Sequence, residues 1–407
     1  MFTCEDCEKK NTILYWCKAC NAKHFQQNFI NWTSGNDDID KFIQDTQLSS
    51  INYYHVLEWL PYNRFYDIEY ITEGGFGKVY KAKWIDGYIL SWDSKIQNWK
   101  RIHSNKFVAL KSLYNSENVI FEFINEITMH CKAIDDNDLT FATVRVYGIT
   151  QDPETKNYMI VLPYAENGSL RNYLDKSYYE LSWNGKFTQL CYIAHGLGII
   201  HRNRLIHRDL HTGNILLFSN TFCKCTAITD MGLCKPADYN ATENTKNSIY
   251  GVLPYIAPEI LRGQNYTKAA DIYSFGIIIY EVIPGLPPYH DLSHNEYLAI
   301  KICQGLRPSF NIKVPQLIVH LIKRCLDANP LNRPVIDEIK VILFTFYTSR
   351  LLNFNNLPEP KNSDDYYDEQ NDNIISEKFS ESLQIDLSQL KINNDDQIIE
   401  PKDEGKV

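Results

Sequence analysis

Hydrophobic and polar positions change their spacing along the chain in a way that predicts a strand-rich part before a helix-rich part. Apolar residues alternate with polar ones from Phe65 through Ile68 and Tyr70, and the alternation resumes at Val79 and Tyr80. This period suits strands with one buried face. From residue 166 onward the pattern becomes helical, with long apolar runs at residues 187–200 and 272–283. The second run, of about twelve residues, suits a buried core helix and is too short to cross a membrane.

The segment before the first strands predicts short amphipathic helices. Its apolar residues recur at helical spacing on either side of a Ser-Gly-Asn break at residues 34–36, and they are Phe25, Phe29, Trp32, Ile39, Phe42 and Ile43. Pro61 ends this region, so we expect a helical linker over residues 26–64. Residues 85–105 connect two predicted strands and are longer than the turn of a hairpin needs to be. We expect this segment to protrude.

The net charge of −9 comes entirely from the C-terminal tail. Residues 351–407 hold 14 Asp and Glu against 5 Lys and Arg, so residues 1–350 are neutral overall. A neutral body gives no support to binding of nucleic acid or of an anionic membrane. Because the tail has only isolated aliphatic residues, we expect residues 352–407 to be disordered. The first residues do not resemble a secretory signal, and we expect a cytoplasmic protein.

Four of the eleven cysteines form two Cys-x-x-Cys pairs with nine residues between them, at Cys4, Cys7, Cys17 and Cys20. In a reducing compartment such pairs bind metal or serve redox chemistry more often than they form structural disulfides. Four thiolates at this spacing predict a tetrahedral Zn²⁺ site, with residues 1–25 as a zinc ribbon or knuckle. His24 is a spare candidate ligand, and redox pairs or chance are the alternatives.

A glycine-rich stretch between two strand patterns predicts a phosphate-binding loop. Its members are Gly74, Gly75, Phe76 and Gly77, and residues without a Cβ let backbone N–H groups approach phosphate oxygens. A simple hairpin turn would explain the same stretch. Further on, Lys111 ends an apolar strand, where a buried ammonium needs an anion. A lysine that extends to solvent at a strand end is the alternative.

Three motifs in the second half decide between these alternatives. Residues 207–214 read His-Arg-Asp-Leu-His-Thr-Gly-Asn, residues 230–232 read Asp-Met-Gly, and residues 257–259 read Ala-Pro-Glu. In this order they resemble the eukaryotic protein kinase family, and within it the tyrosine-kinase-like group, over residues 65–345. The resemblance implies a two-lobed α+β fold with an N-lobe over residues 65–163 and a C-lobe over residues 166–345. It also implies ATP-dependent transfer of phosphate to a protein, to Ser or Thr more readily than to Tyr.

The resemblance assigns roles to individual residues. Lys111 would contact the α and β phosphates of ATP and pair with Glu126, with Glu122 as the competing partner one turn earlier. Asp209 would accept the proton of the acceptor hydroxyl, and Mg²⁺ would be held by Asn214 and Asp230. The phosphate loop would contain Thr72, Gly74, Gly75, Phe76 and Gly77. The adenine site would be formed by Val79, Ala109, Leu162, Pro163, Ala165 and Leu216. Scaffold roles fall to Asp271, and to Arg333 as the partner of Glu259.

The chain departs from the family pattern at four places. Thr72 stands where the first loop glycine is usual, and Met231 is the middle residue of the Asp-Met-Gly triplet. His211 and Val252 stand where Ser/Thr kinases usually place a Lys and a Thr that bridge the catalytic Asp and the γ-phosphate. A scaffold of the pseudokinase type, binding nucleotide without transferring phosphate, is therefore the alternative function. The candidate activating phosphorylation sites, for which Arg208 is a candidate receiver, are Thr242, Thr245, Ser248 and Tyr250.

Overall fold

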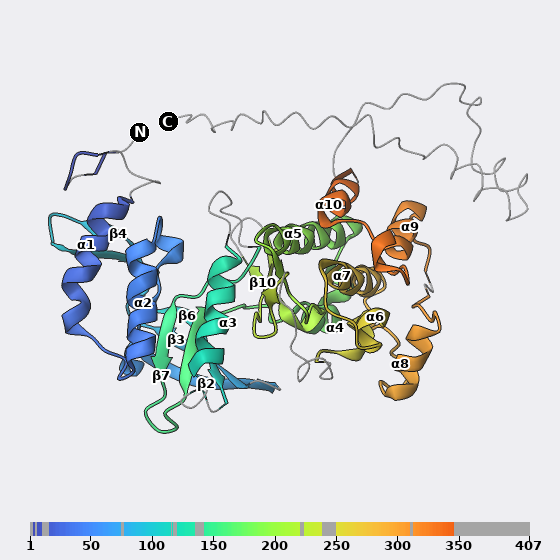
Figure 1. The fold of residues 1–407 in the computed structure, drawn as a ribbon, viewed down its shortest axis with the longest axis horizontal. Coiled ribbons are helices and arrows are strands. Elements are labelled where there is room, and N and C mark those ends of the chain that lie inside the picture. Colours follow the sequence, from blue (N-terminus) through green and yellow to red (C-terminus); the bar gives the residue numbers. More distant parts are fainter. Residues whose placement is uncertain are drawn as a thin grey trace, which may run out of the picture. The chain divides into compact units, whose positions relative to one another are not determined.

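A six-stranded sheet dominates the first part of the computed structural model, with strand order β1-β7-β8-β6-β3-β2 (Figure 1). The strands are β1 (Glu58–Trp59), β2 (Phe65–Gly74), β3 (Gly77–Trp84), β6 (Lys106–Leu113), β7 (Gly148–Gln151) and β8 (Tyr158–Pro163). β1 pairs with β7 in parallel, and the other neighbours are antiparallel. Helix α3 (Ile120–Lys132) packs its buried Phe123 and Ile127 into a cluster with sheet residues such as Ile160.

The structure describes residues 3–4, 6–9, 16–74, 77–114, 116, 120–134, 142–219, 224–237, 250–309 and 312–345. These belong to one unit, residues 1–348, and the second unit, residues 349–407, lies outside the described part. The predictions for Gly75, Phe76, Thr242, Thr245, Ser248 and the tail at 352–407 therefore fall outside the described residues. No helix in the described ranges is long and apolar enough to cross a membrane.

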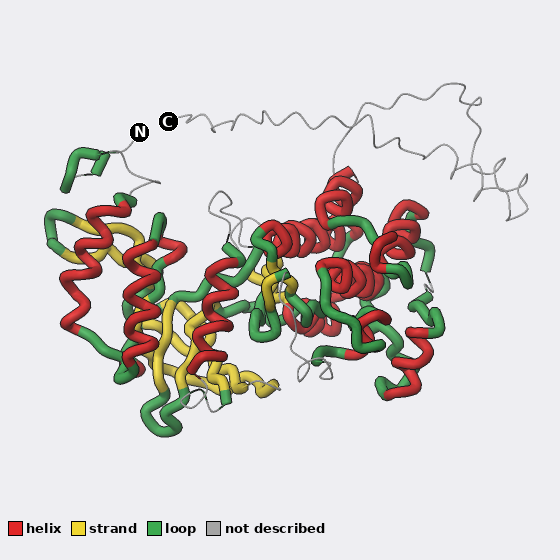
Figure 2. The backbone as a smooth tube through the Cα atoms, in the orientation of Figure 1, coloured by secondary structure: helices red, strands yellow, loops and turns green. Residues whose placement is uncertain are grey.

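The second part of the chain is mainly helical, as Figure 2 shows. Its helices are α4 (Leu170–Ser177), α5 (Trp183–Arg202), α6 (Pro258–Leu261), α7 (Lys268–Val282), α8 (Glu296–Cys303), α9 (Gln316–Cys325) and α10 (Ile336–Thr345). Two small antiparallel pairs join β9 (Leu205–Ile206) to β12 (Lys235–Pro236), and β10 (Ile215–Ser219) to β11 (Lys224–Ile228). The two long apolar runs of the sequence lie in α5 and α7, which are buried along most of their length. The expected two-lobed α+β fold is confirmed.

The first N-terminal helix begins earlier than the sequence pattern suggests, whereas the second begins where the pattern places it. Helix α1 (Lys18–Asn28) starts directly after Cys17, whose carbonyl oxygen accepts the Asn21 N–H, and a 3₁₀ turn at Phe29–Asn31 follows. Helix α2 (Asp37–Ser49) starts at the predicted break, because the Asn36 side chain accepts the N–H groups of the second and third helical residues. Residues 26–64 also supply β1, so this segment contributes a strand to the sheet.

The segment at residues 85–105 does not protrude, contrary to expectation. It forms a hairpin of β4 (Tyr88–Asp93) and β5 (Asn98–Ile102), and Ile89 is buried in a cluster with Trp16, Phe25 and Val56. The Trp99 ring stacks on that of Phe25, with 4.2 Å between ring centroids. The expectation failed because it considered the hairpin alone, whereas the burial partners of its apolar residues lie far away in the sequence.

Candidate active site

A buried lysine on an inner strand of the six-stranded sheet holds two carboxylates together. Lys111 Nζ on β6 lies 2.8 Å from Glu126 Oε1 on α3 and 3.0 Å from Asp230 Oδ1. Burial alone would lower the pKa of Lys111, but the charges of Glu126 and Asp230 outweigh it and raise that pKa. Burial likewise opposes ionisation of Asp230, yet Lys111 keeps the pKa of that carboxyl below its usual value. Burial has the larger effect on Glu126 and raises the pKa of that carboxyl, although the charge of Lys111 opposes the rise.

Helix α3 selects the partner of Lys111. Glu126 is buried at 4% exposure, whereas Glu122, one turn earlier, is exposed. Residues 123 and 127 on the same helix pack into the core, and this fixes which turn faces the sheet. The structure therefore brings Lys111 to Glu126 and leaves Glu122 in solvent.

Asp209 lies in the loop between β9 and β10. Asn214 Nδ2 donates to the Asp209 carbonyl oxygen at 2.9 Å and to Asp209 Oδ2 at 3.1 Å. Among the described residues, the other carboxylate oxygen, Oδ1, is buried without a hydrogen-bond partner. A buried carboxylate oxygen without a donor is costly in a fold that has no use for it. The arrangement therefore leaves one oxygen of Asp209 ready to accept a proton from a further molecule.

The central helix α7 fixes the backbone of this loop. Asp271 is 1% exposed, and its carboxylate accepts the backbone N–H groups of His207 at 2.9 Å and Arg208 at 3.0 Å. Burial works against its charge, but the His201 side chain at 2.9 Å and the backbone donors prevail, and they lower the pKa of Asp271. Arg208 takes a left-handed conformation with φ 71°, which turns the chain toward Asp209.

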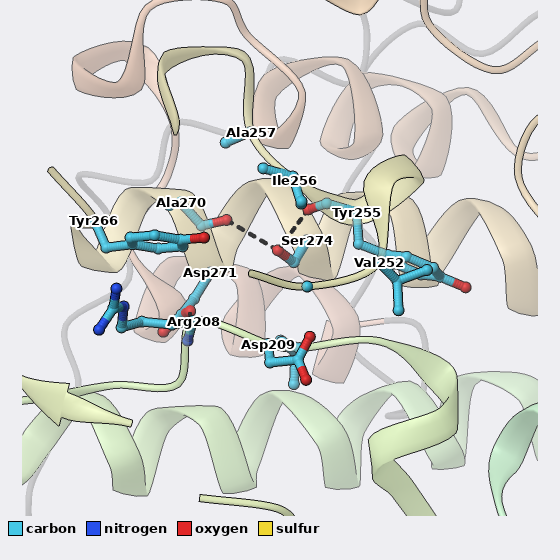
Figure 3. A pocket seen from close by; sticks show the side chains of 12 residues that line it. Arg208, Asp209, Val252, Tyr255, Ile256, Ala257, Tyr266, Ala270, Asp271 and Ser274 are labelled. Atoms are coloured by element: carbon cyan, nitrogen blue, oxygen red, sulfur yellow. Dashed lines mark hydrogen bonds between the residues drawn. The ribbon is translucent and has the colours of Figure 1, made fainter. Parts of the chain in front are cut away.

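Two of the four departures from the family pattern, His211 and Val252, lie near Asp209. His211 Nε2 is 3.8 Å from Asp209 Oδ2, and its Nδ1 accepts the Gly213 N–H at 3.1 Å, so the ring caps the short 3₁₀ turn at Thr212–Asn214. Val252 lines a pocket next to Asp209 and is 40% exposed (Figure 3). Neither side chain places a permanent cation or a hydroxyl beside the Asp209 carboxylate.

The pocket in Figure 3 opens beside Asp209 and is bounded by the segment that carries Val252 and Tyr255. Ser274 on α7 holds that segment in place by donating to the Tyr255 carbonyl oxygen at 2.8 Å. The Tyr255 hydroxyl donates to Glu281, a wholly buried carboxylate that also accepts the Thr212 hydroxyl at 3.0 Å. Glu281 is a residue that the sequence reasoning missed. Its signal was available, because it is the one charged residue in the apolar run at 272–283.

Of the glycine-rich stretch the structure describes Gly74, which ends β2, and Gly77, which begins β3, and these two residues pair with each other. A Cβ on Gly77 would lie 1.8 Å from the Ser112 carbonyl oxygen of β6, so only glycine lets these strands approach. Thr72 pairs with Val79 after an irregularity in the register, and it is exposed. The described part of the stretch thus meets the requirements of a tight hairpin, and the phosphate-binding role stays a prediction.

The candidate adenine residues come from neighbouring elements. Ala109 on β6 is directly opposite Leu162 on β8, and Pro163 ends β8 opposite Val108. Ala109, Leu162 and Leu216 belong to one apolar cluster, while Val79 lies on β3 opposite Lys111. Ala165, just after β8, is buried. The structure therefore brings Ala109, Leu162 and Leu216 of this set into one cluster, and the adenine-binding role stays a prediction.

The four N-terminal cysteines also come together. Their sulfur atoms all lie within 4.8 Å of one another, and Cys7 and Cys17 are 3.8 Å apart. Tetrahedral Zn²⁺ with bonds of about 2.3 Å would separate thiolates by about 3.8 Å, so the cluster has the size that such a site needs. His24 is engaged elsewhere, because its Nε2 lies 2.8 Å from Asp6 Oδ2 and its ring stacks on Trp92.

Comparison with known proteins adds independent findings. The family model described as "Protein tyrosine and serine/threonine kinase" matches residues 67–343. A probable serine/threonine-protein kinase, roco5, from Dictyostelium discoideum is 30% identical over 321 residues, covering 74% of this chain and 10% of that protein. A cysteine-rich receptor-like protein kinase from Oryza sativa subsp. japonica is 28% identical over 353 residues, covering 81% of this chain. A probable LIM domain-containing serine/threonine-protein kinase of D. discoideum is 29% identical over 315 residues, covering 75% of this chain. The chain spans 45% of the length of each of these last two relatives.

Proposed function

This chain belongs to the protein tyrosine and serine/threonine kinase family, and on that premise we propose that it transfers the γ-phosphoryl group of MgATP to a protein hydroxyl. The observation that carries the proposal is the contact of Lys111 with both Glu126 and Asp230, in a fold that also leaves Asp209 Oδ1 without a hydrogen-bond partner among the described residues. An anionic nucleotide needs the cation, and an acceptor hydroxyl needs the free oxygen.

The residues present fit a magnesium nucleotide. Asp230 and Asn214 carry the oxygen atoms that a hard cation prefers, and Asn214 uses its amide nitrogen on Asp209, which leaves its amide oxygen for another ligand. Lys111 would hold the α and β phosphates, and Glu126 would keep Lys111 in place. Bound Mg²⁺ would neutralise the charge of the transferring phosphoryl group.

In the proposed reaction Asp209 takes the proton of the acceptor hydroxyl. The acceptor oxygen forms a bond to the γ-phosphorus, and the bond from that phosphorus to the bridging oxygen of ADP breaks, so ADP leaves with that electron pair. The segment of Val252 and Tyr255, which lies beside Asp209, would border the polypeptide that carries the hydroxyl. Glu281 supports this segment by accepting the Tyr255 hydroxyl.

Serine or threonine is the proposed acceptor, because several relatives bear the name serine/threonine-protein kinase. Membership in the tyrosine-kinase-like group is also part of the proposal, and it rests on the motifs at residues 207–214 and 257–259. We assign the transfer domain to residues 65–345. An intracellular location completes this part of the proposal, since four closely spaced free thiols suit a reducing compartment.

The cysteine cluster is proposed to hold one structural Zn²⁺. The support is the mutual approach of Cys4, Cys7, Cys17 and Cys20 to the size of a tetrathiolate site. Four protein ligands would leave no open position on the metal, so its role would be to hold residues 1–25 in their fold.

Incubation of the full chain with γ-labelled MgATP and a generic protein acceptor tests the proposed activity. Label should appear on serine and threonine after phosphoamino-acid analysis, and Lys111→Met should abolish it by misplacing the nucleotide phosphates. Nucleotide binding by the parent without any transfer would favour the scaffold alternative instead.

A further inference from the structure

The N-terminal segment at residues 16–60 is built into the sheet of the first lobe. The Leu60 N–H donates to the Ile149 carbonyl oxygen at 2.8 Å, and β1 pairs with β7 in parallel. The backbone conformation of Gly148 is one that other residues can adopt, so it does not by itself require glycine. A Cβ at this position, however, would lie 2.1 Å from the Glu58 carbonyl oxygen. Glycine is required at 148 because the N-terminal segment lies so close to it.

Ion pairs and aromatic rings fasten the same segment to the β4–β5 hairpin. The Arg101 guanidinium on β5 donates to both carboxylate oxygens of Glu58, one of them at 3.1 Å, and to the Gly87 carbonyl oxygen at 2.8 Å. Arg145 donates to the Tyr53 carbonyl oxygen, and the centroid of the Tyr88 ring lies 4.8 Å from its guanidinium carbon. A guanidinium this deeply buried is stabilised by the faces of aromatic rings. The segment, the hairpin and the sheet are therefore joined by several independent contacts.

Helix α2 of this segment is in contact with α3. Ile39 and Ile43, one helical turn apart, are both fully buried, and they share an apolar cluster with Phe123 and Ile127 of α3. On its other side this cluster reaches the sheet, where the Phe123 ring lies 5.8 Å from that of Tyr158 on β8. The apolar face of α3 is thus covered from both the sheet and α2.

Glu126 lies on the same turn of α3 as these apolar residues, between Phe123 and Ile127. The contact between Glu126 and Lys111 depends on the position of α3. The two side chains lie 2.8 Å apart, and a shift of α3 by about an ångström would break their hydrogen bond. Gln47, near the end of α2, donates to the Leu57 carbonyl oxygen at 2.7 Å and so ties α2 to the strand that joins the sheet. The chain of contacts runs from β1 through α2 to the turn that carries Glu126.

We propose that residues 16–60 form an internal activating cap, in which Ile39 and Ile43 of α2 position α3 so that Glu126 reaches Lys111. The proposal rests on the proposed phosphotransfer, for which the cap residues are positioning residues. The cap residues would touch neither the nucleotide nor the acceptor. Loss of the cap packing frees α3 to move away from the sheet, and Lys111 then loses the carboxylate that orients it toward the phosphates.

The double variant Ile39→Ala with Ile43→Ala in the full chain tests the cap, and Ile30→Ala is the matched control. Ile30 belongs to the same segment but is 91% exposed. The double variant should lose at least about tenfold in kcat/KM, and amide exchange in residues 120–132 should rise at least about tenfold while α7 stays protected. The control should change neither quantity. Gly148→Ala, which displaces β1, should produce the same pattern by a different route.

A double-mutant cycle shows whether the cap acts through Glu126. In a Glu126→Gln background, the two alanine changes should cost less than about threefold further in kcat/KM, because the contact they support is already lost. Equal losses in both backgrounds would overturn the proposal, and so would unchanged exchange in α3. If the alanine pair unfolds the domain, the milder pair Ile39→Val with Ile43→Val carries the test, with α3 again expected to lose protection before α7. A parent without transfer activity would refute the proposed function, while the exchange measurements would still decide whether the cap holds α3.

Discussion

Replacing His211 by lysine together with Val252 by threonine should raise kcat for a serine or threonine acceptor. The His211 Nε2 atom lies 3.8 Å from Asp209 Oδ2, so a lysine ammonium there would be close to the reacting groups. A full charge at about 4 Å is worth roughly 4 kcal/mol at an effective dielectric constant of about 20. Since Asp209 would share that cation with the phosphoryl group, we expect about 1–2 kcal/mol in the transition state, which is roughly tenfold in kcat.

The same change has a cost that the structure defines. His211 Nδ1 accepts the Gly213 N–H, and lysine has no acceptor, so the variant should lose about 1 kcal/mol of stability, as expected for a missing cap. His211→Asn is the matched control, because its amide oxygen can keep the cap without adding charge. We expect His211→Asn to retain both the melting temperature and the kcat of the parent.

Steady-state kinetics on an acceptor that the parent already uses measures the gain, and thermal melting measures the cost. Each single change, His211→Lys or Val252→Thr, should give less than its share of the gain, because the two new side chains would act on one network. A double variant no faster than the parent, with its melting temperature lowered as expected, would refute the view that these positions weaken phosphate stabilisation.

Three further predictions concern other parts of the chain. Replacing Cys4 and Cys17 by serine should release about one zinc ion per chain, measured by elemental analysis, without lowering the melting temperature of the transfer domain; a parent free of zinc would end that idea. Burial, reinforced by the charge of Lys111, lowers the pKa of His130 from 6.5 to about 4, so the unfolded chain binds the extra proton first and stability should fall as the pH drops from about 6.5 toward 4. The loss amounts to about 3 kcal/mol, and denaturant titrations should show a flatter pH dependence for His130→Gln. Gly77→Ala should destabilise the first lobe because its Cβ meets a β6 carbonyl, whereas Gly74→Ala, whose Cβ meets no described atom within 4 Å, should not.

The contacts around the lysine were predictable from the sequence because each was marked by a local motif. The pattern placed Lys111 on an apolar strand, which the structure extends to Leu113. Glu126 was placed on a helix by the apolar spacing around it, and Asp209 lay in a motif whose order along the chain is specific. The structure shows the contact of Lys111 with Glu126. The resemblance to the family was enough to predict it. The roles of these residues in transfer stay predictions, which the experiments above test.

The contacts that fasten the N-terminal segment were not predictable in this way. Glu58 pairs with Arg101 across 43 residues of chain, and Arg145 reaches Tyr53 across 92. Neither pair has a periodic spacing or a motif that would mark it, and a charged residue in one segment is compatible with many partners. The glycine at 148 was informative only once the strand beside it was known. Packing between distant segments, more than local propensity, decides such contacts.

The central claim is that Asp209 serves the acceptor hydroxyl, and the most direct test is single-turnover transfer by Asp209→Asn measured beside its affinity for MgATP. Asp291→Asn, the same change at an exposed position, is the control. We predict that Asp209→Asn slows transfer by about 10²- to 10⁴-fold while its dissociation constant for MgATP stays within about twofold of the parent, since the lost carboxylate accepts a proton and does not hold the nucleotide. Transfer by Asp209→Asn at the rate of the parent would contradict the claim.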